Sequence, residues 1–414
     1  MKKILFTIID GLGGLPSKEL EGKTELEFAK TPNLDSLTAR GVNGIVDIYH
    51  GIAPESDAAV LTLLGYDPKK YYVGRGPFEA VGIGAPFKDG MLALRCNYAT
   101  SVDGKQLTDR RVGRTLKSDE AAKLADAIQK NVRLTGAEVI FRAGLAHRAV
   151  LIIKADKPLS KDITNTDPAY GTRHGIPEAL AKYDMAVQEC RPLSKDAKLS
   201  AGLVNEFTEK AYKVLREHPV NVARRKKGLL EANIIISRDA GNTTPRLPKI
   251  GEGWAILADM PLEVGIARIA GMEVIGLPLP TMTPSDYHLR VKKTLQAMKK
   301  YNNLYIHLKG PDLFGHDKDF KGKVKSIEDI DRYFYGPLIK KTDFDDYVIL
   351  VSADHSTPCI VKGHSGDPVP LLIYTNGIRA DSVKSFSERE CAKGRIGKIN
   401  GLDVLKTVLE YAKG

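Results

Sequence analysis

The chain has few cysteines, no long hydrophobic segment and no internal repeat or low-complexity tract. Its four cysteines, Cys96, Cys190, Cys359 and Cys391, are widely separated, and none forms a CxxC pair. This spacing argues against a disulfide framework or a zinc knuckle and predicts ordinary thiols. No apolar run approaches the roughly 20 residues that a membrane-spanning helix needs. The sequence therefore predicts a soluble globular protein with no membrane association.

An apolar run near the amino terminus, ILFTII, ends at Asp10. No small-residue cleavage site follows it, which argues against a secretory signal peptide. A strand buried on both faces is the better interpretation, because such strands are continuously hydrophobic. The prediction is a cytoplasmic protein.

Basic residues outnumber acidic ones, 62 against 51, which gives a formal net charge of +11. A positive balance favours anionic partners. The densest basic run, at 223–228, is short and has no interleaved aromatic residues, so it is interpreted as a solvated helix end and nucleic-acid binding is not predicted. A small phosphorylated substrate fits the dispersed charge better. The oligomeric state is left open, with a homo-oligomer as one option.

Hydrophobic periodicity predicts strands and helices in two different patterns along the chain. The terminal parts are expected to contain strands at 3–9, 303–308, 347–353 and 370–374, and helices at 31–37, 56–64, 285–300, 326–340 and 402–412. The middle is expected to contain strands at 92–100, 138–144, 148–154, 233–237 and 255–259, and helices at 119–130, 199–217 and 262–271.

Candidate ligand residues occur only within 10–56 and 312–364. We therefore predict a discontinuous catalytic domain, 1–78 with 281–414, and an inserted domain at 79–280.

Metal-ligand side chains directly follow several of the predicted strands. They are Asp10, Asp312 with His316, Asp354 with His355, and His364 in a Gly-flanked loop. In an open α/β sheet the loops at the carboxyl ends of the strands converge on one crevice. Asp312 and His316, four residues apart, share one face if their loop turns helically. Three Asp, three His and one Ser would suit two divalent cations rather than one.

Ser56 is predicted near the start of a helix, where backbone N–H groups and the helix dipole favour a phosphate. Each candidate also has a purely structural interpretation: Asp before Gly forms turns, Ser caps helices and an isolated His is often structural. The joint pattern is far rarer than any single member. A non-catalytic metal-binding or nucleic-acid-binding protein is a further alternative, but it has no use for Ser56 between two acidic residues.

Several segments resemble the archaeal-type 2,3-bisphosphoglycerate-independent phosphoglycerate mutases, which are members of the alkaline phosphatase superfamily. The segments are IIDGLGG, PESDAAVLTLLGYDP, GRGPFEA, HLKGPDLFGHDKD and SADHSTPC with KGHSGDPVPLLIY. The resemblance extends over nearly the whole chain. It implies an α/β fold with an alkaline-phosphatase-like, mostly parallel sheet flanked by helices and an inserted α/β or α+β lid domain.

The resemblance also implies an isomerase mechanism with Ser56 as the nucleophile. One cation would be held by Asp10, Ser56, Asp354 and His355, and the other by Asp312, His316 and His364. Manganese is expected first, with zinc, cobalt or magnesium as alternatives. Attack on 3-phosphoglycerate would give phosphoserine and bound glycerate, whose 2-hydroxyl would take the phosphate back. This interconversion serves glycolysis and gluconeogenesis and needs no bisphosphoglycerate.

Such a mechanism requires the inserted domain to exclude water and to supply cations to the substrate. The candidate substrate-binding residues are Lys309, Arg75, Arg95, His147, Arg148, Arg173, His174, Arg238 and Arg268. A phosphatase, phosphodiesterase or phosphopentomutase of the same superfamily is the alternative. It would share the dinuclear site and the nucleophile and would differ in the lid.

Overall fold

The computed structural model describes residues 1–50, 53, 55–173, 176–180 and 182–414. These residues form two compact units. The first unit contains Met1–Lys70, Leu247–Asp259 and Ala270–Gly414. The second contains Tyr71–Arg246 and Met260–Ile269. The chain therefore leaves the first unit and returns to it more than once.

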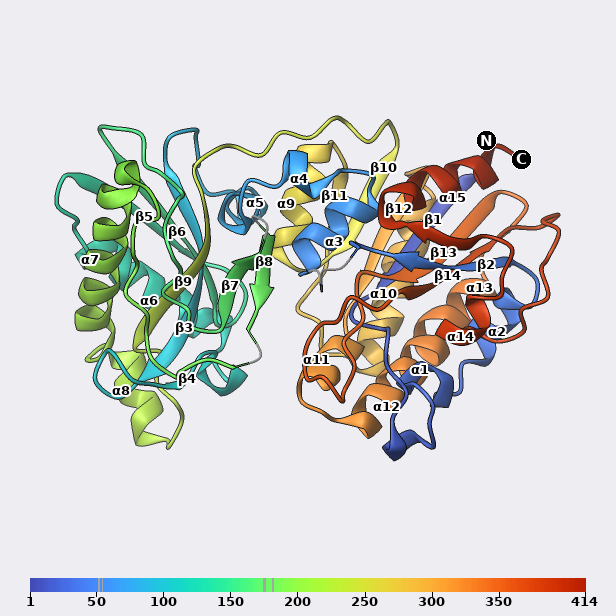
Figure 1. Cartoon of the computed structure of the whole chain (residues 1–414), viewed down its shortest axis with the longest axis horizontal. Helices are drawn as coiled ribbons and strands as arrows, with labels where there is room; N and C mark the ends of the chain where they lie inside the picture. Colours follow the sequence, from blue (N-terminus) through green and yellow to red (C-terminus); the bar gives the residue numbers. More distant parts are fainter. Residues whose placement is uncertain (51–52, 54, 174–175, 181) are drawn as a thin grey trace. The chain divides into compact units, whose positions relative to one another are not determined.

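The first unit is built on an eight-stranded sheet in the order β11-β10-β12-β1-β13-β14-β2-β15 (Figure 1). β14 is antiparallel to both of its neighbours, and the other pairings are parallel. The predicted α/β class with a mostly parallel sheet is therefore confirmed. The strands are β1 (Lys3–Ile9), β2 (Val42–Asp47), β10 (Trp254–Ala258), β11 (Glu273–Gly276), β12 (Asn303–Leu308), β13 (Tyr347–Ala353), β14 (Val369–Tyr374) and β15 (Gly397–Asn400).

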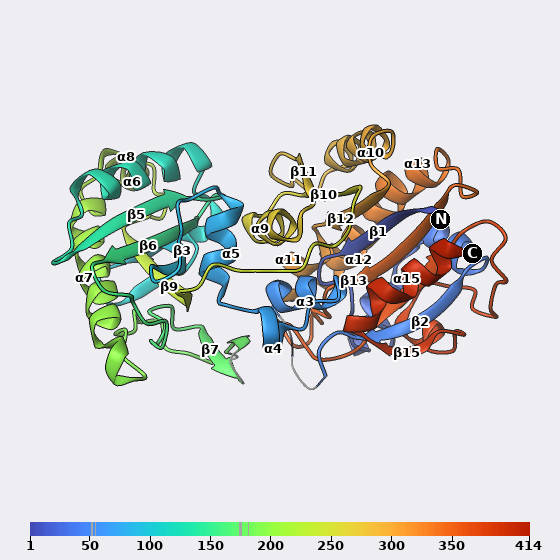
Figure 2. The same ribbon diagram turned by 90° about the horizontal axis from the view of Figure 1, so that it is seen from above.

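Helices lie on both faces of this sheet, for example α10 on one side and α15 on the other (Figure 2). The helices are α1 (Glu25–Phe28), α2 (Pro32–Thr38), α3 (Ser56–Leu63), α4 (Pro68–Tyr71), α10 (Pro284–Met298), α11 (Pro311–His316), α12 (Phe320–Ile330), α13 (Gly336–Ile339), α14 (Glu388–Cys391) and α15 (Val404–Lys413). In the described part of the chain no helix is both long and apolar enough to cross a membrane.

The second unit contains a five-stranded antiparallel sheet in which β4, β3, β6 and β5 follow one another and β9 also pairs with β3. A separate hairpin is formed by β7 and β8. The strands are β3 (Leu92–Ser101), β4 (Leu107–Asp109), β5 (Ala137–Ala143), β6 (Arg148–Ala155), β7 (Tyr170–Arg173), β8 (Ile176–Ala179) and β9 (Ile234–Gly241). The helices are α5 (Arg75–Gly82), α6 (Ser118–Asn131), α7 (Lys198–Leu215), α8 (Pro219–Lys226) and α9 (Pro261–Ala270).

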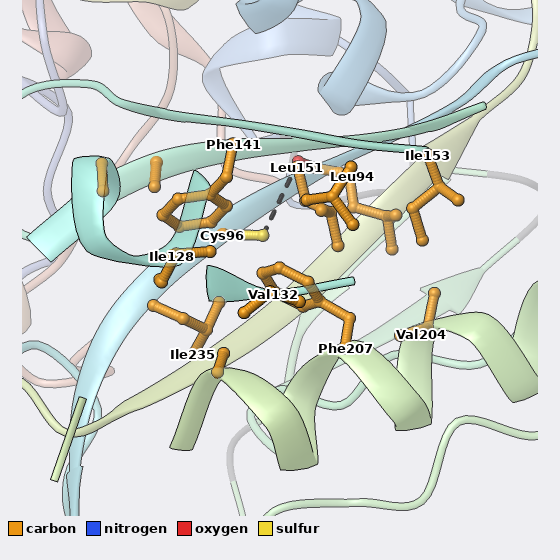
Figure 3. Close-up of a cluster of buried hydrophobic side chains, with 14 of the residues drawn as sticks. Leu94, Cys96, Ile128, Val132, Phe141, Leu151, Ile153, Val204, Phe207 and Ile235 are labelled. Carbon is orange, nitrogen blue, oxygen red and sulfur yellow. Dashed lines mark hydrogen bonds between the residues drawn. The ribbon is translucent and has the colours of Figure 1, made fainter. Parts of the chain in front are cut away.

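The sheet of the second unit buries both of its faces. Side chains in β3 alternate. Leu94 and Cys96 face the helices α6 and α7 (Figure 3). Ala93 instead packs with Ala80 of α5. This alternation is the period of two that a strand requires. The aromatic ring of Phe207 from α7 lies in this core with its centroid 5.5 Å from that of Phe141.

We expect Phe207→Ala to destabilise the second unit by about 3–5 kcal/mol, because it removes a buried aromatic ring and leaves a cavity. The prediction is checked by urea unfolding followed by circular dichroism. Leu199→Ala on the same helix is the control, since Leu199 is 48% exposed. Equal transition midpoints for the two variants would contradict the assigned core.

The predicted domain boundaries differ from the two units in two places. Residues 71–78 belong to the second unit, because α5 packs on its sheet so closely that a Cβ on Gly76 would lie 2.3 Å from the Ala93 carbonyl oxygen. Residues 247–259 and 270–280 belong to the first unit, because β10 and β11 extend the large sheet beyond β12. This second difference arises because β10 pairs with β12, a strand that is distant in the sequence.

Candidate active site

The central strands of the large sheet bring acidic residues to one edge. β12, β1 and β13 are parallel neighbours, so their carboxyl ends meet there. Asp10 directly follows β1 and Asp354 directly follows β13, and both are buried. Asp312 lies in α11, shortly after β12, and its backbone N–H donates to the Asp10 carbonyl at 3.1 Å. Asp10 and Asp312, some 300 residues apart in the sequence, are thus adjacent in the structure.

All seven residues predicted as metal ligands lie at this edge of the sheet. His355 joins several of them: its Nε2 is 3.5 Å from Asp10 Oδ1, 3.3 Å from Asp354 Oδ2 and 3.4 Å from Ser56 Oγ. The hydroxyl of Ser56 therefore lies beside a group of carboxylates and an imidazole.

A second group of ligand atoms lies beside the first. Asp312 Oδ1 is 3.5 Å from His316 Nε2 and 3.3 Å from His364 Nε2, and the two imidazole nitrogens are 3.3 Å apart. The rings of His364 and His355 stack with their centroids 3.7 Å apart. The two groups are therefore in direct contact.

Grouping by distance divides these atoms into three overlapping sets, within each of which all atoms lie within 4.8 Å of one another. The sets are Asp312 with His316 and His364, Asp10 with Asp312 and His355, and Asp10 with His307 and Asp354. The first set coincides with one predicted ligand group. The other two sets both contain Asp10. One of them holds His355 and the other holds Asp354, which were predicted as ligands of a single cation. Each set also contains a residue not predicted for that cation, Asp312 in the first and His307 in the second.

The buried carboxylates carry opposite pKa shifts. Burial raises the pKa of Asp10 to about 8, and the charges of Asp354 and Asp312 add to this although Lys309 opposes it. Burial would also raise the pKa of Asp354, but His355, His307 and Lys309 together bring it well below its usual value. The raised pKa of Asp10 shows that its negative charge is unfavourable beside the other carboxylates. A bound cation would therefore stabilise this site.

His355 is held neutral, with one ring nitrogen available. Burial and the neighbouring His364 lower its pKa to about 4, against the opposing charge of Asp354. Thr357 Oγ1 donates to Asp312 at 2.8 Å, so it accepts the proton of His355 Nδ1, which lies 3.0 Å away. The lone pair of Nε2 then points toward Asp10 and Ser56, which is the tautomer that a metal ligand needs.

Two buried oxygens, Asp10 Oδ1 and Asp354 Oδ2, accept no hydrogen bond from the described residues. Buried polar atoms without such a partner are rare and call for an explanation. A bound divalent cation would explain both. The donor set of carboxylate oxygens and imidazole nitrogens is one that manganese, zinc and cobalt accept.

Ser56 begins α3, and Glu55 precedes it as the N-cap. Its backbone therefore contributes to the positive end of the helix dipole, which favours an anion at the hydroxyl. Glu55 is buried, and its Oε1 lies 3.8 Å from His364 Nδ1. Glu55 thus lies against one of the ligand imidazoles.

Within the second unit, a buried carboxylate is surrounded by arginines. Glu79 accepts from Arg75 Nε at 2.8 Å and from Arg95 Nη1 at 2.5 Å. Burial would raise the pKa of Glu79, but the two arginines outweigh it and lower this pKa. Burial, with the repulsion of Arg75, lowers the pKa of Arg95 to about 9. Arg75 and Arg95 therefore share the carboxylate of Glu79.

Three more of the predicted residues interact with this arginine cluster. Arg148 forms no ion pair with the described residues, and burial lowers its pKa to about 10. Arg238 pairs with Asp239 and lies over the ring of Tyr170 at 3.6 Å. His147 is buried, and burial together with Arg148 holds its pKa well below the usual value. The cluster has the charge excess expected of an anion site.

The remaining predicted residues lie elsewhere. Lys309 belongs to the first unit, where its Nζ is 3.0 Å from Asp10 Oδ2. Arg268 donates to the carbonyls of Val81 and Gly82 at the end of α5 and therefore caps a helix. Arg173 ends β7 and its side chain is not described, and His174 lies outside the described residues.

Known proteins resemble this chain over almost its whole length. The family model for 2,3-bisphosphoglycerate-independent phosphoglycerate mutase matches residues 38–221. A relative with that name from Aeropyrum pernix is 42% identical over 96% of this chain and 96% of its own length. The chain belongs to the 2,3-bisphosphoglycerate-independent phosphoglycerate mutase family.

Further relatives agree with this phosphoglycerate mutase assignment. A Thermococcus kodakarensis protein of the same name is 40% identical, covering 99% of this chain and 97% of its own. A solved protein from Pyrococcus horikoshii is 33% identical with a TM-score of 0.79, covering 100% of this chain and 97% of that one. The cofactor-independent phosphoglycerate mutase from Thermoplasma acidophilum is 32% identical with a TM-score of 0.63, covering all of both chains.

For a phosphoglycerate mutase of this family, sequence reasoning missed three residues at the site. His307 lies inside β12, where a continuous apolar run conceals which face it occupies. Thr357 follows His355 by two residues, and only the fold reveals that its hydroxyl joins Asp312 to His355. Glu55 was noted only as an acidic neighbour of the nucleophile. Its position before a helix start was the available signal.

Proposed function

We propose that this chain interconverts 3-phosphoglycerate and 2-phosphoglycerate through a phosphoserine on Ser56. The observation that carries the proposal is the position of the Ser56 hydroxyl, 3.4 Å from His355 Nε2, at a helix start beside two groups of metal-ligand atoms. A hydroxyl in such a position suits nucleophilic attack on phosphorus. The names of the curated relatives favour a mutase over a phosphatase, phosphodiesterase or phosphopentomutase.

Two divalent cations would be held at the edge of the large sheet. One ligand set is Asp10, Ser56, Asp354 and His355, and the other is Asp312, His316 and His364. When bound, two such ions would lower the pKa of the Ser56 hydroxyl and neutralise charge on the phosphoryl group. Manganese is the first choice, and zinc, cobalt or magnesium are alternatives.

The reaction would then proceed in two phosphoryl transfers, first to Ser56 and then back to glycerate. In the first step the Ser56 hydroxyl loses its proton, the Oγ–P bond forms as the bond between phosphorus and the 3-oxygen of the substrate breaks, and the released oxygen takes up a proton. Glycerate then reorients, its 2-hydroxyl loses a proton and attacks phosphorus, the Oγ–P bond breaks, and Ser56 Oγ takes up a proton. His147 is the candidate for transferring those protons; burial and nearby arginines hold its pKa well below the usual value, and an anionic substrate beside it would raise this pKa toward the working pH. The Lys309 ammonium would offset negative charge beside Asp10.

The arginine cluster of the second unit would bind the carboxylate or phosphate of the substrate. Arg75, Arg95, Arg148 and Arg238 lie with three buried carboxylates, those of Glu79, Asp239 and Glu263. Guanidinium groups bind both anions in bidentate fashion. By retaining glycerate and excluding water, this unit would prevent hydrolysis of the phosphoserine.

Arg148→Met is expected to raise KM about 10- to 100-fold, because a charge-assisted hydrogen bond to an anion contributes about 1.5–3 kcal/mol. Arg148 suits the test because it forms no ion pair with the described residues whose loss would disturb the fold. Arg142→Met on the neighbouring strand is the control, since its side chain is exposed. An unchanged KM for Arg148→Met would remove this residue from the substrate site.

The mutase proposal is tested by a coupled assay with enolase, run on the metal-loaded protein without added 2,3-bisphosphoglycerate. Formation of 2-phosphoglycerate is the expected result. Release of free phosphate without 2-phosphoglycerate would replace the mutase with a phosphatase. A cytoplasmic location stays a prediction, tested by fractionation of the source cells.

A further inference from the structure

Behind the candidate metal site lies a buried charged network that the proposed chemistry does not use. Lys323, in α12, is fully buried, and its Nζ donates to the Gly13 and Thr357 carbonyls, both at 2.8 Å. Gly13 belongs to the first loop (residues 10–14) and Thr357 to the second loop (residues 354–359). Burial of an ammonium carries a large desolvation cost, which a methionine of similar length would avoid. A role other than packing is therefore indicated.

Two carboxylates, the buried one of Glu25 and the half-buried one of Glu388, complete this network. Lys323 Nζ lies 4.0 Å from Glu25 Oε2. Glu25 Oε1 accepts from the Cys359 backbone N–H at 2.9 Å, and Glu388 Oε1 accepts from the Gly14 N–H at 2.9 Å. Each carboxylate thus holds one of the two loops. Lys323 holds both loops at once.

The two loops are also packed too closely to move independently. The Gly13 carbonyl accepts from the Thr357 N–H at 3.0 Å in addition to the Lys323 ammonium. A Cβ on Gly13 would lie 2.0 Å from Ser356 Oγ, and one on Gly14 would lie 1.9 Å from Glu25 Oε2. A displacement of the Lys323 ammonium would therefore shift both loops together.

Thr357 connects Lys323 to two of the candidate ligands, Asp312 and His355. Its carbonyl is held by Lys323, and its hydroxyl donates to Asp312 at 2.8 Å and accepts from His355 Nδ1 at 3.0 Å. One hydroxyl thus orients a ligand from each of the two proposed sets. Hydrogen bonds behind the ligands commonly decide how well a metal is held.

We propose that Lys323 is the positioning residue of the metal centre: through Thr357 it aims Asp312 and His355 before a cation binds. This inference rests on the two-cation centre proposed above. It makes Lys323 a determinant of metal affinity and geometry, and it gives the residue no contact with substrate.

The test is Mn²⁺ binding to metal-stripped full-length protein by calorimetry, together with the visible absorption spectrum of the Co²⁺ form. Lys323→Met should weaken Mn²⁺ binding about 10- to 100-fold, the usual cost of losing such a supporting contact, and should alter the Co²⁺ bands. Lys325→Met on the same helix should change neither, because the Lys325 side chain is 65% exposed. Thr357→Val should weaken binding, and its effect should not add to that of Lys323→Met.

Mn²⁺ affinity within twofold of native and an unchanged Co²⁺ spectrum in Lys323→Met would overturn the inference while leaving the mutase proposal intact. Additive losses in the double variant would overturn the route through Thr357. If Lys323→Met does not fold, Thr357→Val decides, and native affinity in that variant refutes the inference. A native chain that binds no Mn²⁺ would overturn the inference and the two-cation centre together.

Discussion

Replacement of Ser56 by alanine is expected to lower the rate of phosphoglycerate interconversion by at least about 10⁴-fold, as loss of a covalent nucleophile does in other enzymes. This factor corresponds to about 5 kcal/mol of barrier. The oxygen that would form the phosphoserine disappears, and among the described residues no other hydroxyl lies within hydrogen-bond reach of His355 Nε2. The coupled enolase assay measures the loss.

The fold should tolerate this change, because Ser56 is half-buried at a helix start and alanine is a good helix former. Metal content, measured by mass spectrometry, should fall little, since Asp10, Asp354 and His355 remain. Acid quenching with labelled 3-phosphoglycerate should trap label on the native chain and none on the variant. Ser36→Ala, on the exposed face of α2, is the matched control. Unchanged turnover in Ser56→Ala would rule out the serine mechanism.

Much of the fold is readable from the sequence where a strand is buried on both faces. β1, β12 and β13 have the predicted bounds, 3–9, 303–308 and 347–353, because a continuous apolar run has only one compact interpretation there. The partner of a strand is not encoded locally. β10 was predicted as a strand, but only its parallel pairing with β12 places it in the large sheet.

Buried charges account for the other differences. The helix predicted at 326–340 begins instead at Phe320, capped by Asp319, and is interrupted by a π-helical turn at 331–335. Lys323 conceals the earlier start, because a lysine in a helix is normally a surface residue. Arg224, expected on a solvated helix end, is buried and bonded to Glu120. Such residues show their role only when their partners are known.

The candidate site likewise contains some residues that the sequence predicts and others that only the fold reveals. Asp10, Asp312, Asp354 and His355 were found because they follow strands that end at one edge. Their allocation to individual cations did not follow from spacing, and His307 went unnoticed inside its strand. The arginines of the second unit come from four separate elements, so only the fold could bring them together.

Removal of metal is expected to lower activity by on the order of 10³-fold or more, since loss of even one fixed donor to a developing charge costs about 10²–10³. Chelation should leave three carboxylates, the buried ones of Asp10 and Asp354 and the half-buried one of Asp312, without the charge that compensates them. Mn²⁺ or Co²⁺ should restore activity. Ca²⁺ should not, because it prefers oxygen ligands and this site presents three predicted imidazoles.

A matched pair of variants separates the dinuclear site from a nonspecific effect of chelator. Asp312→Asn should lose at least one equivalent of bound Mn²⁺, because the Asp312 carboxylate lies within 3.5 Å of two ligand imidazoles. Asp317→Asn, just beyond the same helix and exposed, should bind metal as the native chain does. Full activity in the metal-free protein, or full Mn²⁺ stoichiometry in Asp312→Asn, would contradict the two-cation centre. Because Asp312 belongs to two of the three groups of ligand atoms, its loss should weaken both cations at once.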